Sequence, residues 1–295
     1  MPSSDRQPSS SRTPMSGADT TDVGDALEEG LKRLRQLPVL LAVPTLVTLL
    51  SVGDLRMVLD RGSGSSAGVK FAFPAPIGDL WTFVDTPDPV TGGVAPIGVV
   101  DPSSSLVIVV FGSVLSFLLY GVLTAGYLGS IQAFRRRGGY DFLANVRAYA
   151  LTYVGLSLVI FGAGLVVFVL AFAVPLMLLV TIPLMLAVGY LFWGSWFLVP
   201  VANLEAIPAL QRSYRLAVSE SDYAVWALAH FVLVGILSLV ATPFVMNSSV
   251  VGVVLGLAVV VPVGFVLTVG SLRVIDDLAD RSEPNQEPDD AFETY

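Results

Sequence analysis

The hydrophobic and polar positions of this 295-residue chain separate into long apolar windows and short charged connections. Four windows contain no Asp, Glu, Lys or Arg: Gln36–Gly53 (18 residues), Pro102–Phe134 (33), Ala148–Leu204 (57) and Tyr223–Leu272 (50). A charged side chain at the centre of a bilayer costs roughly 2.5–3.5 kcal/mol on insertion scales. Windows of this length and composition therefore predict membrane-spanning helices.

One span needs about twenty residues to cross a hydrocarbon core of roughly 30 Å. The four windows then hold one, one, two and two spans, because the longest window would measure about 85 Å as a single helix. We predict an all-α polytopic membrane protein with a membrane domain over residues 22–275. Its six predicted spans cover about 37–52, 105–130, 150–172, 176–200, 223–243 and 250–272.

The first span is the weakest of the six. Residues 37–52 are barely long enough to cross, and Pro44 lies inside them. A short span can be accommodated by thinning of the bilayer or by its flanking side chains. The alternative is a re-entrant or interfacial helix that does not cross.

The distribution of Lys and Arg predicts the topology, because cytoplasmic loops are enriched in both. Thirteen of the 16 basic residues precede the first span, lie between spans two and three or four and five, or follow span six. The other three, Arg56, Arg61 and Lys70, share the loop 54–101. We therefore expect a multi-pass protein of the cell (plasma) membrane with both termini cytoplasmic.

Aromatic residues near the same span ends predict a belt at headgroup level: Tyr127, Tyr149, Tyr153, Trp193, Trp196, Tyr223 and Trp226.

The connections between spans carry further patterns. Amphipathic segments near 22–36, 141–153 and 207–218 each precede a pair of spans and predict three cytoplasmic interfacial helices. The polar tail 1–21 and the acidic tail 276–295 are predicted to be disordered. In the outer loop 54–101, the aromatic stretch Lys70–Val84 is expected to lie on the membrane surface or to fold over the mouth of the bundle. A lid that captures a ligand is the sharper alternative.

Composition narrows the possible functions. The formal net charge is −8, Lys occurs only twice and Cys is absent, a pattern that resembles proteins of halophilic archaea. An acidic chain offers no electrostatic surface for nucleic acid, so we expect no nucleic-acid partner. The absence of Cys excludes disulfides, thiolate catalysis and Cys-based metal sites. The lipid bilayer is the one partner that composition predicts directly.

No enzyme motif survives inspection. Glu28-Glu29-x-x-x-Arg33 matches the first motif of intramembrane prenyl-protein proteases, but those enzymes also need several His residues and this chain has one. The same single His excludes zinc sites of the HExxH type. We predict that the protein is not an enzyme and has no catalytic, metal-binding or cofactor-binding residue and no cofactor.

Two residues remain as candidate sites. His230 is the only ionisable residue other than tyrosine inside a predicted span, which favours a role in a proton relay or a ligand contact. The alternative is a neutral imidazole satisfied by hydrogen bonds within the bundle, since no carboxylate in a span could act as its partner. Asn247-Ser248-Ser249 is a candidate N-glycosylation site on the predicted outer side.

Small residues at four-residue spacing predict close helix contacts. Gly252-x-x-x-Gly256 and Gly121-x-x-x-Ala125-x-x-x-Gly129 permit the backbones of two helices to approach each other. These contacts form within the bundle or across a dimer, and we favour the bundle. The oligomeric state is left open.

Two stretches carry a resemblance to known membrane proteins. They are Gly126-Tyr127-Leu128-Gly129 with the following Arg135–Arg137, and Glu-Ala-Ile-Pro-Ala-Leu-Gln-Arg-Ser-Tyr-Arg-Leu-Ala at 205–217. Over about residues 105–275 the chain resembles uncharacterised multi-span families of archaea and bacteria, related to the membrane domain attached to some bacterial glycerophosphodiester phosphodiesterases. The resemblance implies a membrane domain and transfers no catalytic residue, because the phosphodiesterase chemistry belongs to a separate soluble domain.

These observations leave two hypotheses for function. The first is a membrane scaffold or partner protein of the cell envelope without a catalytic site, which docks proteins at its cytoplasmic face. The second is a transporter or permease component that works with a soluble partner. The absence of carboxylates and Arg within the spans weighs against the second, because ion-coupled transport usually employs them.

Overall fold

The computed structural model describes residues 22–60, 68–86, 106–173 and 177–282, and within these ranges every regular element is a helix. In this described part of the chain, five helices are long and apolar enough to cross a membrane. The protein is therefore an all-α polytopic membrane protein, as the sequence predicts. The five helices are α5 (Leu106–Arg137), α6 (Phe142–Ala173), α7 (Met177–Ala202), α9 (Ser221–Asn247) and α10 (Ser249–Ser282).

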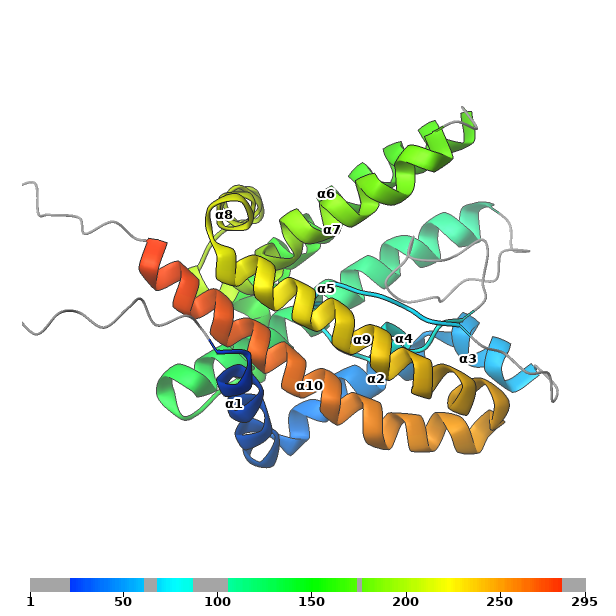
Figure 1. Ribbon diagram of the computed structural model, residues 1–295, viewed down its shortest axis with the longest axis horizontal. Coiled ribbons are helices and arrows are strands. Elements are labelled where there is room, and N and C mark those ends of the chain that lie inside the picture. The colour runs from blue at the N-terminus through cyan, green and yellow to red at the C-terminus, as the bar shows by residue number, and fades with distance from the viewer. Residues whose placement is uncertain (1–21, 61–67, 87–105, 174–176, 283–295) are drawn as a thin grey trace, which may run out of the picture.

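The long helices run between two ends of one bundle (Figure 1). One end carries α1 (Val23–Gln36), α8 (Ala206–Ser219) and the last turns of α10, and we call it the α1 end. The opposite end carries α3 (Val52–Asp60) and the turn between α9 and α10, and we call it the far end. The alternation of helix directions along the chain matches the predicted order of spans.

The amphipathic helix α1 packs across the second half of α10. Asp22 caps it by accepting a hydrogen bond from the backbone N–H of Gly24 at 2.9 Å, and Arg33 and Arg35 lie in its last turn, where they complement the helix dipole. Its buried face includes Ala26 and Gly30. A Cβ at Gly30 would lie 2.6 Å from the carbonyl oxygen of Val266, so only glycine permits this approach.

The predicted first span, about 37–52, corresponds in the structure to one arm of a bent pair of helices, of which α1 is the other arm. The helix α1 ends before Pro38, because a proline disfavours helical geometry in the residue that precedes it. The run Pro38–Leu50 then leaves α1 at an angle of 98°. This run consists of a short 3-10 turn and α2 (Ala42–Leu50), and it is about 20 Å long. Ser51 then separates α2 from α3. A sixth crossing exists if this bent pair forms one span, so that crossing stays a prediction.

The small-residue motifs pack within the bundle. Gly121 faces Val154 and Gly129 faces Asn145, both on α6, and this brings α5 and α6 together. Gly256 faces Val245 across the α9–α10 hairpin. The prediction that these glycines serve packing within the bundle is confirmed.

Two boundaries differ from the sequence analysis. The second interfacial segment and span three form one continuous helix, α6. The helix α10 continues to Ser282, beyond the predicted domain end at 275, because Asp276 is held by arginines of α5. The predicted disordered tail 1–21 and the remaining part of the predicted tail 276–295, residues 283–295, lie outside the described residues.

The predicted aromatic belt is wrong for most of its members. Tyr127, Tyr153 and Tyr223 are fully buried, and Trp193 and Trp226 are nearly so. They pack against one another and against neighbouring helices, as in the stacked pair Trp193–Tyr223 with ring centroids 4.4 Å apart. These rings form the core of the α1 end and do not face headgroups.

Candidate functional site

Residues 68–86 enter the bundle from the far end and return to it, and we call them the re-entrant segment (cyan in Figure 1). Its two ends lie together, since a Cβ at Gly68 would meet the Asp85 side chain. The backbone N–H of Lys70 donates to Ser238 Oγ at 2.8 Å, and that of Asp85 donates to Thr242 Oγ1 at 2.9 Å. Both hydroxyls belong to the half of α9 nearer the far end, so the segment begins and ends at the same level.

The middle of the re-entrant segment lies much deeper. The carbonyl oxygen of Ala72 is 3.2 Å from His230 Nδ1. His230 lies 17 residues before Asn247, which is about 26 Å along the helix at 1.5 Å per residue. Gly78 contacts Gly264 near the middle of α10, backbone against backbone. The segment therefore passes the midpoint of the bundle.

The sequence of the segment explains why non-helical backbone is tolerated at this depth. Backbone N–H and C=O groups in a membrane must be buried in protein or line water, because lipid offers them no partner. Pro74 and Pro76 have no N–H to satisfy, and both are buried. Gly78 has no side chain, which lets the turn lie directly on α10. The pattern Pro-x-Pro-x-Gly is thus suited to a buried turn.

A short helix, α4 (Leu80–Phe83), follows the turn and is tied to α2. Asp79 caps it, accepting hydrogen bonds from the backbone N–H of Thr82 at 3.1 Å and from Thr82 Oγ1 at 2.6 Å. The N–H of Leu80 donates to Thr48 Oγ1 at 3.1 Å, and Trp81 Nε1 donates to the Thr48 carbonyl at 2.9 Å. The first broken span and the re-entrant segment therefore form one unit.

The ionisable groups of this unit are engaged by neighbours. Lys70 Nζ donates to the carbonyl oxygen of Trp81 at 2.7 Å. Asp79 is buried, and its carboxyl accepts both hydrogen bonds from Thr82.

His230 lies where the sequence analysis places it, inside a span, and its partner is a carbonyl. A carbonyl oxygen only accepts, so Nδ1 carries the proton in this hydrogen bond. The side chain is 4% exposed. This geometry agrees with the alternative of an imidazole satisfied within the bundle, and it fixes the re-entrant segment to α9.

Sequence reasoning missed the other residues of this site. Lys70 and Asp79 lie in the stretch that was expected on the membrane surface or over the bundle mouth, whereas most of residues 74–84 are buried between α2, α9 and α10. The sequence signal that could have predicted a buried turn here was the Pro74-x-Pro76-x-Gly78 pattern inside an aromatic stretch. Asn247, the candidate glycosylation site, is exposed and ends α9, and only Ser248 separates it from the start of α10. Its glycosylation stays a prediction.

A second polar cluster joins three helices at the α1 end. Arg135 of α5 contacts Glu29 of α1 at 3.0 Å and Asp276 of α10 at 3.1 Å, and its side chain is only 9% exposed. Arg136 contacts Asp276 at 3.0 Å, and Arg273 contacts Glu29 at 3.7 Å. Glu29 and Asp276 thus bind these three arginines, and we call these five residues the ion cluster; Glu29 is also 3.5 Å from Arg33 of its own helix. It fixes α1 to the bundle.

Among the described residues, no group of three His, Asp or Glu side chains could hold a metal ion. Comparisons with protein-family models, curated proteins and solved structures found no match. The chain is therefore described by its fold class: an all-α polytopic membrane protein with a re-entrant segment in its core.

Proposed function

We propose that this integral membrane protein is a non-catalytic scaffold of the cell envelope that holds a protein partner at its α1 end, on the cytoplasmic side. One observation carries the proposal: the protein fills the centre of its bundle with its own re-entrant segment. Hydrogen bonds to α2 and α9 and a glycine contact with α10 hold that segment. Because the centre of the bundle is filled by the chain itself, we assign recognition of a partner to the outer surfaces.

The charge distribution supports a cytoplasmic α1 end. Of the basic residues in the described ranges, Arg56 and Lys70 belong to α3 and the re-entrant segment. The others lie on α1, at the adjoining ends of α5, α6 and α10, or on α8. Positive charge at one end of a membrane bundle favours the cytoplasmic side.

The outer face of α1 is the surface that we assign to the partner. Glu28, Leu31, Lys32 and Arg35 are exposed on it, while Ala26 and Gly30 are buried on the opposite face. Leu31 is 56% exposed among these charged neighbours. A mixed-charge face with a central apolar residue suits a protein partner, and the ion cluster holds it in place.

Affinity purification from native membranes tests the proposal. The full chain should recover a protein at stoichiometric yield, and Leu31→Asp should abolish that recovery because it places a charge at the centre of the face. Leu143→Asp is the matched control, since Leu143 is also exposed on a helix near the α1 end but lies on α6. Recovery of the chain alone, or equal loss with both variants, would contradict the proposal.

A transporter component is the second candidate, and the re-entrant segment itself favours it. Non-helical backbone at membrane depth is typical of selectivity filters and of the broken helices of transporters. A transporter requires this segment to move, whereas a scaffold requires it to stay in place.

Cysteine labelling separates the two candidates, because the chain has no natural Cys. Ser238→Cys places a thiol beside Lys70, at a position that is fully buried. A scaffold protects this thiol from a water-soluble maleimide, and Glu205→Cys, at an exposed position, supplies the labelled control. Labelling of Ser238→Cys at a rate comparable to Glu205→Cys would favour the transporter.

A further inference from the structure

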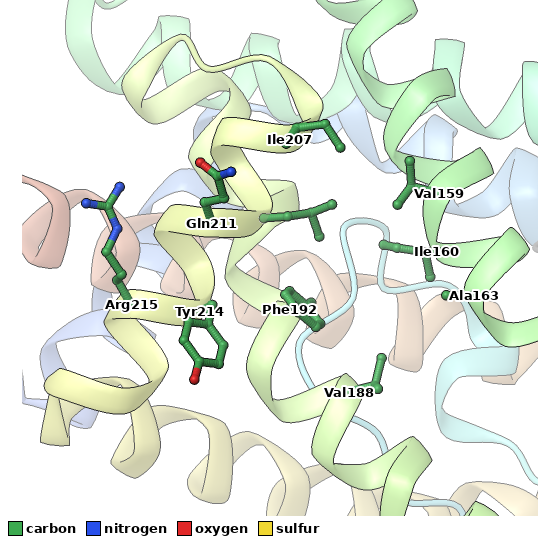
Figure 2. Close-up of a pocket in the computed structure, with 10 residues that line it drawn as sticks. Val159, Ile160, Ala163, Val188, Phe192, Ile207, Gln211, Tyr214 and Arg215 are labelled. Carbon is green, nitrogen blue, oxygen red and sulfur yellow. The ribbon is translucent and has the colours of Figure 1, made fainter. Parts of the chain in front are cut away.

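A cavity of about 630 Å³ lies between α6, α7 and α8, and its lining residues all belong to these three helices (Figure 2). Val159 and Ile160 of α6 and Val188 and Phe192 of α7 form its apolar walls. This volume is within the range of about 300–1,000 Å³ that is typical of small-molecule sites. The cavity is therefore large enough for part of an amphiphilic molecule.

The helix α8 supplies the remaining wall. Ile207, Leu210, Gln211 and Tyr214 line the cavity, and their spacing of three and four residues places them on one face of the helix. Ser213 and Ala217 hold a different face of α8 against α7, through hydrogen bonds with the Leu191 carbonyl and the Tyr190 hydroxyl. The face of α8 that lines the cavity is therefore not the face that carries these hydrogen bonds to α7.

The position of the cavity relative to the membrane follows from its three helices. Both α6 and α7 are membrane-crossing helices with exposed apolar side chains, such as Leu158 and Ile182. In contrast, α8 is a short amphipathic helix at the α1 end, outside the set of crossing helices. A cavity between such helices lies where hydrocarbon chains meet headgroups.

Charge is present on one side of the cavity only. Arg215 lines it from α8, is exposed, and makes no ion pair with any residue in the described ranges. Gln211 and Tyr214 add an amide and a hydroxyl on the same helix (Figure 2). The walls formed by α6 and α7 are aliphatic or aromatic. An occupant must therefore be apolar over most of its length and anionic at one end.

We propose that this cavity binds an anionic phospholipid, with one hydrocarbon chain between α6, α7 and α8 and the phosphate against Arg215. The hydrocarbon chain gains little by leaving the bilayer, since lipid is as apolar as the cavity. Selectivity comes from the guanidinium, which binds phosphate through charge-assisted, bidentate hydrogen bonds. This lipid site does not depend on the partner face of α1.

Native mass spectrometry of the full chain in neutral detergent tests the site, with phosphatidylglycerol and phosphatidylcholine as probes. The unmodified chain should bind phosphatidylglycerol about tenfold more tightly than phosphatidylcholine, as expected for one strong charge-assisted contact. Arg215→Gln should remove this preference, and Arg215→Lys should keep part of it. Arg137→Gln is the matched control, because Arg137 is an exposed arginine at the α1 end that does not line the cavity.

A second variant tests the cavity independently of charge. Ala163 lines the wall on α6, so Ala163→Phe should fill the space and reduce binding of both lipids while leaving helix content unchanged. Equal binding of the two lipids by the unmodified chain would overturn the proposal. So would an equal loss of preference in Arg137→Gln, or unchanged binding in Ala163→Phe. Partner recovery by Leu31→Asp is a separate readout, so failure of one proposal is distinguishable from failure of the other.

Discussion

Single residues determine how closely the re-entrant segment approaches its walls. Gly78 and Gly264 touch backbone to backbone, and Gly235 and Gly189 receive the rings of Phe71 and Phe73. The lone His in an apolar window made His230 predictable from sequence. These glycine contacts were not predictable, because each joins residues far apart in the chain and has no local period.

We expect Gly264→Ala to destabilise the protein by about 1–3 kcal/mol, as overpacking does in tight cores. A Cβ at Gly264 would meet the carbonyl oxygen of Gly78, which cannot rotate away as a side chain can. Gly162→Ala is the control, because no atom lies within 4 Å of a Cβ there. Thermal unfolding in detergent should show a lower Tm for Gly264→Ala only, and a similar Tm for both variants would contradict the backbone contact.

At the scale of elements, hydropathy predicted the crossing helices well and their ends less well. The predicted span 176–200 and the helix α7 agree closely, because the insertion of apolar residues is a local property. The end of α10 was missed, since Asp276 and Asp277 look like the start of a solvated tail until Arg135 and Arg136 are placed beside Asp276. The position at which α10 ends therefore depends on tertiary ion pairs, which the composition of the segment does not reveal.

The ion cluster should contribute more to stability than other charges at the same end. Arg135→Ala leaves Glu29 and Asp276, both largely shielded from solvent, without their shared partner. We expect a loss of about 2 kcal/mol, below the range for fully buried pairs. Arg137→Ala, at an exposed arginine, should change the free energy of unfolding by less than about 0.5 kcal/mol. Equal effects in a denaturation series would show that the cluster adds nothing beyond surface charge.

At the scale of the whole molecule, the sequence predicted the class, the order of crossings and the grouping of basic residues at one end. It placed Lys70–Val84 outside the bundle because that stretch is too short and too interrupted by proline to resemble a span. Its burial depends on α9 and α10, whose residues lie some 160 positions later. The sixth crossing and the cytoplasmic location of the termini stay predictions.

Cysteine labelling of intact cells tests the orientation directly. Asn247→Cys, at the exposed end of α9, should react with a membrane-impermeant maleimide added from outside. Glu205→Cys, between α7 and α8, should react only after permeabilisation. The reverse pattern would place the α1 end outside and would remove the proposed cytoplasmic partner.

The re-entrant segment also imposes an order on assembly. Ala72 is synthesised 158 residues before His230, and at 5–20 residues per second this interval is about 8 to 30 seconds. During that time the segment can pair with α2 but lacks its walls on α9 and α10, since neither helix exists yet. It reaches its final depth only after the last hairpin is inserted. The innermost part of this protein is therefore one of the last to reach its place.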